Sequence, residues 1–151
     1  MNWSGIVGVV LAVVPTAALA DWQYTRWGMT PQQVIAASNG TVSWRAVKLP
    51  KPNGPREEIG GSYAAGERIF DVSFTFSDGR LSIVSLKADP CDGSLLADLK
   101  SRYGRPLSEA AGMFPFMEWD DKRNDNRVTL FEIFDSCLIT YTPLAERSQG
   151  L

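Results

Sequence analysis

Apolar and polar residues alternate along several segments of this chain, and the alternation predicts β-strands. The clearest run is FDVSFTF at residues 70–76, in which every second side chain is apolar. A period of two gives a strand one apolar face that can be buried and one polar face. Shorter or looser runs of the same kind predict further strands at residues 21–27, 41–47, 58–63, 116–120, 127–134 and 137–142.

A hairpin is predicted directly after the strongest strand. Residues 78–79 are Asp-Gly, a two-residue type I′ turn signal. The register of such a hairpin places Phe74 opposite Ile83. In this register Val84 lies on the face of the second strand opposite to the one expected to be buried. Either both faces of the second strand are partly covered, or a β-bulge lies near Ser82.

The segment GMTPQQV at residues 28–34 contains the signals that begin a helix. Thr30 can act as the N-cap, and the proline after it occupies the first helical position, where a missing N–H costs nothing. Gln33 can complete a capping box by reaching back to the Thr30 N–H. Asn39-Gly40 supplies a left-handed stop, so the pattern predicts a helix at residues 31–38.

A second helix is predicted from Asp92, whose carboxylate can cap it, to the stop signals Gly104 and Pro106. The predicted order is strand, helix, several strands, helix, strands, with neighbouring strands joined by hairpins. We therefore expect an α+β fold in which two short helices pack on one face of a mainly antiparallel sheet. A helix followed by hairpins occurs twice, which hints at a degenerate duplication.

The first twenty residues carry no charged side chain, and an apolar run extends from Ile6 to Val14. The sequence Ala18-Leu19-Ala20 fits the A-x-A pattern at which export signals are cleaved. We expect a signal peptide at residues 1–20 and a single α+β domain at residues 21–151, exported to the periplasm or the extracellular space. The apolar run is shorter than the roughly 20 residues that span a bilayer, so no stable membrane span is expected after cleavage.

The chain has two cysteines, Cys91 and Cys137. In an oxidising compartment an even number of cysteines most simply forms bridges, and we expect a disulfide between these two. Closing a loop of this length would stabilise the fold by at most about 4 kcal/mol on chain-entropy grounds. Two buried free thiols are the competing interpretation.

No histidine occurs in the chain, which excludes Ser-His-Asp and Cys-His catalytic sites and His-ligated metals. Acidic and basic residues are interspersed with a formal net charge of −2, so the basic stripe of a nucleic-acid-binding protein is missing. Glycine-rich phosphate loops and dinucleotide motifs are also missing from the sequence. We expect no nucleic-acid partner, no metal and no cofactor.

Exposed aromatic side chains are the first candidate for a binding site, because they stack on sugars or anchor protein partners. Trp22 and Tyr24 lie near the start of the mature chain and are the two we most expect at the surface. With Trp119 they form the predicted binding surface. Aromatic residues of a small domain more often fill its core, and Trp44, on one side of its strand with Val42, is expected there.

Glu118 and Asp120 are the second candidate site, since their spacing puts both carboxylates on one face of a strand. Glycosidases divide acid and base chemistry between paired carboxylates. Basic residues are interleaved with this pair, however, and charges near a hairpin tip are ordinarily solvated. A purely structural role is therefore the competing interpretation.

Two segments, GMTPQQV at 28–34 and FTFSDGRLSIV at 74–84, suggest a family resemblance. They resemble the G-M-T-x-x-Q-V helix start and the F-x-x-x-G-x-L hairpin of small exported domains shared by outer-membrane assembly lipoproteins and β-lactamase inhibitor proteins. The match covers about one eighth of the chain, and the lipid-bearing cysteine of the lipoproteins is missing after Ala20. The resemblance implies a helix-on-antiparallel-sheet domain that binds other proteins.

Two hypotheses for function follow. The leading one is a non-catalytic exported protein that binds another protein or a component of the cell envelope. The alternative is a carboxylate-dependent hydrolase of cell-wall material that uses Glu118 and Asp120.

Overall fold

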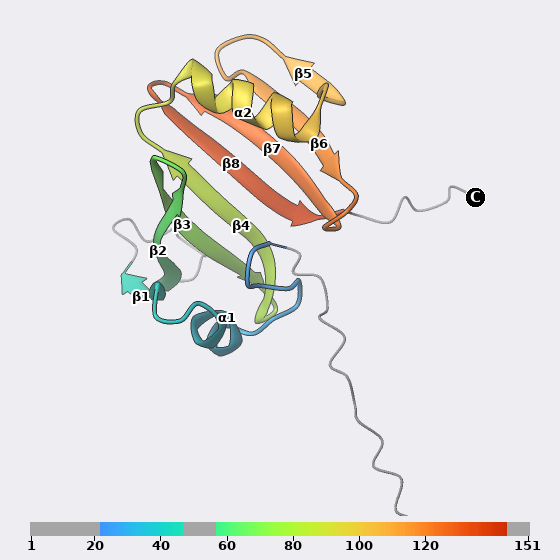
Figure 1. The fold of residues 1–151 in the computed structure, drawn as a ribbon. Coiled ribbons are helices and arrows are strands. Elements are labelled where there is room, and N and C mark those ends of the chain that lie inside the picture. The colour runs from blue at the N-terminus through green and yellow to red at the C-terminus, as the bar shows by residue number, and fades with distance from the viewer. Residues whose placement is uncertain (1–21, 47–56, 145–151) are drawn as a thin grey trace, which may run out of the picture.

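The structure is a computed structural model that describes residues 22–46 and 57–144 (Figure 1). The predicted signal peptide at 1–20 and the C-terminal tail from 145 lie outside the described residues. The described part contains two helices and one eight-stranded antiparallel sheet, which confirms the α+β class. The elements are α1 Pro31–Ala37, β1 Val42–Ala46, β2 Glu57–Ala65, β3 Arg68–Ser77, β4 Arg80–Ala88, α2 Gly93–Tyr103, β5 Ser108–Ala110, β6 Phe116–Asp121, β7 Asn126–Ile133 and β8 Ser136–Pro143.

The strand order in the sheet is β1-β2-β3-β4-β8-β7-β6-β5. Six of its seven strand pairings join strands that follow each other in the sequence, and only β4 with β8 does not. These two strands run side by side through the middle of the sheet in Figure 1. Their pairing runs from Val84 opposite Tyr141 to Ala88 opposite Cys137.

Both predicted helices form, and their caps explain where they begin. At α1 the Thr30 hydroxyl accepts a hydrogen bond from the Gln33 N–H at 3.4 Å, and the Gln33 side chain accepts one from the Thr30 N–H at 2.8 Å. At α2 the Asp92 carboxylate accepts from the Leu95 N–H at 3.0 Å. Gly104 ends α2 with a positive φ of 81°, which a residue without a Cβ adopts at little cost.

One apolar cluster contains buried residues from both helices and from the strands. Its helical members are Val34 of α1 and Leu95 and Leu99 of α2. Along β3, β6, β7 and β8 buried residues alternate with more exposed ones, so these strands bury one face and leave the other accessible.

The hairpin between β3 and β4 confirms the predicted turn and resolves the choice about its register. Asp78 and Gly79 both have positive φ, as a type I′ turn requires. The pairing shifts so that Thr75 lies opposite Ile83, which leaves Ser82 as the extra residue of a bulge. The expected pairing of Phe74 with Ile83 is therefore wrong: Phe74 lies opposite Val84, and the bulge returns Val84 to the buried side.

Three further expectations about strands need correction. Instead of a strand at 21–27, Trp22 and Thr25 form an isolated bridge around a tight turn, in which the Thr25 N–H donates to the Trp22 carbonyl at 2.8 Å. Trp44 is not buried in the core: it lies opposite the buried Ile59, but β1 is an edge strand and Trp44 is 47% exposed. Finally, β5 is an additional three-residue strand that the sequence pattern did not predict.

Candidate functional site

The residues of the predicted aromatic surface are less exposed than expected. Trp22 is buried, because the turn that follows it folds its ring against Tyr63 and Phe74, with centroid distances of 5.2 and 5.8 Å. Tyr24 is half-buried. Trp119 is also buried, and its indole N–H donates to the Gly104 carbonyl at 2.9 Å. The expected exposure of Trp22 is wrong, and a role of these three residues in binding stays a prediction.

The predicted carboxylate pair does share one face of β6, where it is held by a single arginine. Arg127 of β7 forms ion pairs with Glu118 at 3.4 Å and with Asp120 at 2.9 Å. Both carboxylates therefore serve as partners of one guanidinium group, and neither lines the cleft described below. This geometry explains the pair as a cross-strand ion-pair network.

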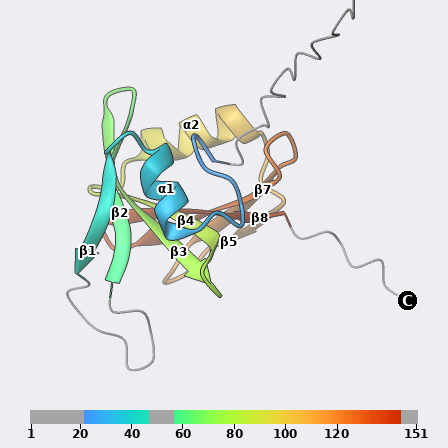
Figure 2. The same cartoon turned by 90° about the horizontal axis from the view of Figure 1, so that it is seen from below.

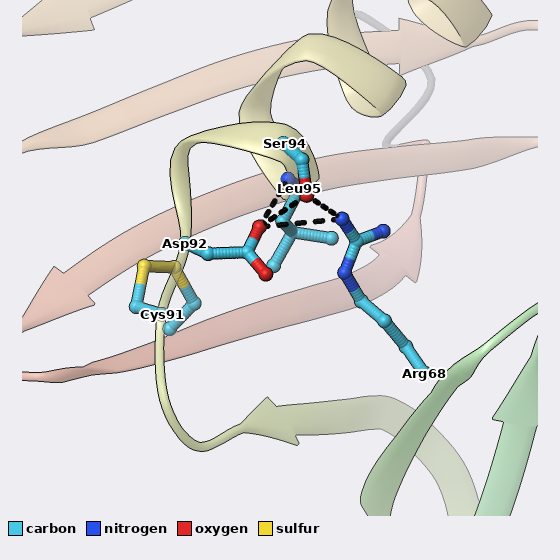
Figure 3. Close-up of a disulfide and its surroundings, with 6 residues drawn as sticks. Arg68, Cys91, Asp92, Ser94 and Leu95 are labelled. Carbon is cyan, nitrogen blue, oxygen red and sulfur yellow. Dashed lines mark hydrogen bonds and ion pairs between the residues drawn. A yellow bond between two sulfur atoms is a disulfide. The ribbon is translucent and has the colours of Figure 1, made fainter.

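Cys91 and Cys137 are joined by a disulfide, with their Cα atoms 4.9 Å apart (Figure 3). The bridge connects the start of α2 to β8. Directly after Cys91, the Asp92 carboxylate accepts hydrogen bonds from Ser94 and the Leu95 N–H and pairs with Arg68 at 3.2 Å. These contacts, the Ser94 hydrogen bond first, lower the pKa of Asp92.

Arg68, from the start of β3, also pairs with Asp98 of α2, six residues after Asp92. The hydrogen bond to Asp98 is the largest cause of the raised pKa of Arg68. Together with the disulfide, this arginine ties α2 to two parts of the sheet that are distant in sequence.

A cleft of about 450 Å³ lies beside α2, and its lining comes from α2, from the turn at residues 22–23 and from strands β2, β3, β4, β6, β7 and β8. We call it the tyrosine cleft, because Tyr63, Tyr103 and Tyr141 all line it. The Tyr103 and Tyr141 hydroxyls lie 3.4 Å apart, and the Tyr63 hydroxyl accepts a hydrogen bond from Gln23 at 2.7 Å. Apart from Trp22, none of the residues that line it belongs to a candidate site of the sequence analysis.

A second feature is an apolar end of the sheet, which we define as Met113, Phe114, Ile133 and Phe134. Their exposed fractions are 85%, 54%, 39% and 90%. The Glu132 N–H donates to the Pro115 carbonyl at 3.0 Å, which brings the loop with Phe114 beside the end of β7. The phenyl rings of Phe116 and Phe131 continue the apolar surface along the strands, with centroids 6.1 Å apart.

The described residues contain no cluster of three or more side chains suited to hold a metal ion. No helix in the described ranges is long and apolar enough to cross a membrane. Comparisons with protein-family models, with curated proteins and with solved structures found no match for this chain.

Proposed function

We propose that this chain is a non-catalytic exported protein that binds another protein or a cell-envelope component through its apolar end. The observation that carries the proposal is Phe134. Its ring is 90% exposed, and its backbone has a φ of 54°, in the left-handed region that bulky residues rarely adopt. Glycine or asparagine would occupy this turn at lower cost, so the exposed phenylalanine ring stands here against both solvation and backbone preference.

The surroundings of Phe134 support a binding surface rather than an isolated exposed ring. A shallow hollow beside it is lined by Ile133 and Leu138 and by the charged residues Lys87, Asp89 and Asp135. Large exposed apolar patches with a polar rim are typical of surfaces that bind other proteins.

We further infer that both helices pack on the same face of the sheet. In support, Val34, Leu95 and Leu99 share one apolar cluster with the buried side of the strands, and Figure 2 shows both helices above β8. The opposite face would then be uncovered and continuous with the apolar end through Phe116 and Phe131. The order α1 then β1 to β4, followed by α2 then β5 to β8, supports the idea of a degenerate duplication.

Export to the periplasm or the extracellular space also belongs to the proposal. It is supported by the signal pattern in residues 1–20 and by the Cys91–Cys137 disulfide, since such bonds persist in oxidising compartments. The resemblance to outer-membrane assembly lipoproteins and β-lactamase inhibitor proteins is part of the same proposal. The capped helix α1 and the Asp78-Gly79 hairpin, which carry the resemblance in sequence, form as elements of the structure.

A site-specific photo-crosslinker tests the proposed surface. Placed at Met113 in the full chain, it should yield a discrete adduct in intact cell envelopes, and Phe134→Asn should reduce that adduct strongly. The matched control carries the crosslinker at Trp44, which is also exposed but lies on β1 at the far edge of the sheet. Equal adducts from both positions, or an adduct that is unchanged by Phe134→Asn, would refute the apolar end as the binding surface.

The hydrolase hypothesis has a separate test. If the wild-type chain releases fragments from purified cell-wall material, and Glu118→Ala or Asp120→Ala abolishes the release while circular dichroism shows an intact fold, the non-catalytic assignment fails. We expect no release from any of the three proteins.

A further inference from the structure

Apolar side chains of the domain core form part of the lining of the tyrosine cleft, beside its polar groups. Phe70, Leu95 and Leu99 line it and are themselves nearly completely buried. Its volume of about 450 Å³ falls in the range of natural small-molecule sites, which bury an apolar ligand body and fix it with a few converging polar groups. The cleft therefore has the size of a ligand site.

Hydrogen-bond donors converge at this cleft. Only one of the Tyr103 and Tyr141 hydroxyls can donate to the other across their 3.4 Å separation, so one phenolic proton stays available. The Tyr63 hydroxyl accepts from Gln23, so its own proton is available too. Burial is the main cause that raises the pKa of Tyr103 and of Tyr141, and both groups therefore keep their protons at neutral pH.

One positively and one negatively charged side chain, Arg102 and Asp121, line the same cleft. The Arg102 guanidinium lies 5.5 Å above the Tyr103 ring, and Asp121 accepts a hydrogen bond from the Asn124 side chain at 2.7 Å. Within residues 22–46 and 57–144 neither of them forms an ion pair, whereas the other cleft arginine, Arg68, is paired with Asp92 and Asp98. Arg102, Tyr103 and Asp121 all line the tyrosine cleft, so both charges belong to the same site.

We propose that the tyrosine cleft binds a free α-amino acid with an apolar side chain. Its carboxylate would face Arg102 and a phenolic O–H, and its ammonium group would face Asp121. The apolar side chain would occupy the interior formed by Phe70, Leu95 and Leu99. A zwitterion on a single carbon provides a partner for the cation, for the anion and for the apolar side chains together, and burying any of these groups without a partner costs free energy.

Isothermal titration calorimetry on the full chain tests the proposal with L- and D-phenylalanine as probes. At least one enantiomer should give saturable binding. N-acetylphenylalanine lacks the ammonium charge and phenylalaninamide lacks the carboxylate, so each should bind about tenfold more weakly or worse. No saturable heat from either enantiomer up to millimolar concentration would overturn the proposal, and so would equal binding of the two blocked analogues and phenylalanine.

Variants locate the binding. Arg102→Gln and Asp121→Asn remove one charge each from partly or fully exposed positions, and each should weaken phenylalanine binding about tenfold. Lys100→Gln is the matched control, because Lys100 is an exposed cation on the same helix that does not line the cleft. Binding that is unchanged in both cleft variants, or that is lost equally in Lys100→Gln, would refute the assignment. None of these results depends on the apolar end, so this inference and the proposed partner surface fail separately.

Discussion

Replacing Phe134 by asparagine should stabilise the fold while it weakens partner binding. A left-handed backbone costs a residue with a Cβ roughly 1–2 kcal/mol, and asparagine adopts it more readily than a bulky aromatic residue. The φ of 54° at Phe134 is in this region. The ring contributes little in return, because it is 90% exposed and full burial of a phenylalanine is worth only about 1.5–3 kcal/mol. A tenth of that burial is about 0.2–0.3 kcal/mol.

The net expectation is a gain of about 0.5–1 kcal/mol in the free energy of unfolding of Phe134→Asn. Two further variants separate the causes. Phe134→Gly should be close to neutral, because the extra chain entropy of glycine in the unfolded state offsets about 0.5–1 kcal/mol of the relief. Phe134→Ala keeps the backbone cost and loses the ring, so it should be destabilised by a few tenths of a kcal/mol.

Urea unfolding of the wild type and the three variants measures these differences, read from the midpoints at an unchanged slope. A loss of about 1 kcal/mol or more in Phe134→Asn would mean that the ring packs against the domain. Phe134 would then be a structural residue, and its exposure would no longer support a role in partner binding.

Three further predictions concern stability. In the capping box at α1, the losses of unfolding free energy caused by Thr30→Ala and Gln33→Ala should be non-additive. The bond from the Thr30 N–H to the Gln33 side chain is the shorter of the two, so Gln33→Ala should cost at least as much as Thr30→Ala, about 0.5–1 kcal/mol each. Urea unfolding of both single variants and of the double variant checks this. The lowered pKa of Asp92 means that its contribution to stability is present above the unfolded-state pKa of about 3.9 and is lost as the pH falls below it, so acid unfolding of Asp92→Asn should depend less on pH in that range. The pKa of Tyr141 is raised, so its contribution to stability is retained below about pH 10 and lost as the pH rises further. This alkaline loss of stability should be smaller in Tyr141→Phe. Alkaline unfolding, followed together with tyrosinate absorbance, measures it.

The sequence predicted the parts of the fold that local chemistry determines. Thr30 and Gln33, Asp92, and the Asp78-Gly79 pair act on neighbours within a few residues, and both helices and the hairpin formed where these signals stand. The β-bulge at Ser82 could not be predicted from local signals alone. It depends on which side of the sheet is buried, because that determines the side on which Val84 must lie.

The errors arose where tertiary contacts override a local pattern. The aromatic segment at 21–27 alternates like a strand, but burying Trp22 against Tyr63 and Phe74 favours a tight turn instead. The three polar-rich residues of β5 have no strand signal of their own, and pairing with β6 supplies their conformation.

The tyrosine cleft had no signal that a single sequence could reveal. Its three tyrosines come from β2, α2 and β8, and Arg102 and Asp121 come from two different elements. In the sequence, Tyr103 stands at the end of the predicted second helix and Tyr141 within the predicted strand at residues 137–142. These residues come together only because the order of strands in the sheet places their elements around the same cleft.

The single pairing of β4 with β8 makes this domain a natural candidate for a split protein. A break after β4 and before Cys91 would give one fragment with α1 and β1 to β4 and another with α2 and β5 to β8. Each fragment would keep all of its other strand pairings, and both cysteines of the bridge would lie in the second fragment. Reassembly would then rest on one ladder, Val84–Ala88 against Cys137–Tyr141, on the ion pairs of Arg68 with Asp92 and Asp98, and on the apolar side chains behind the ladder. Complementation between such fragments would report directly on how strongly the two halves of the sheet recognise each other.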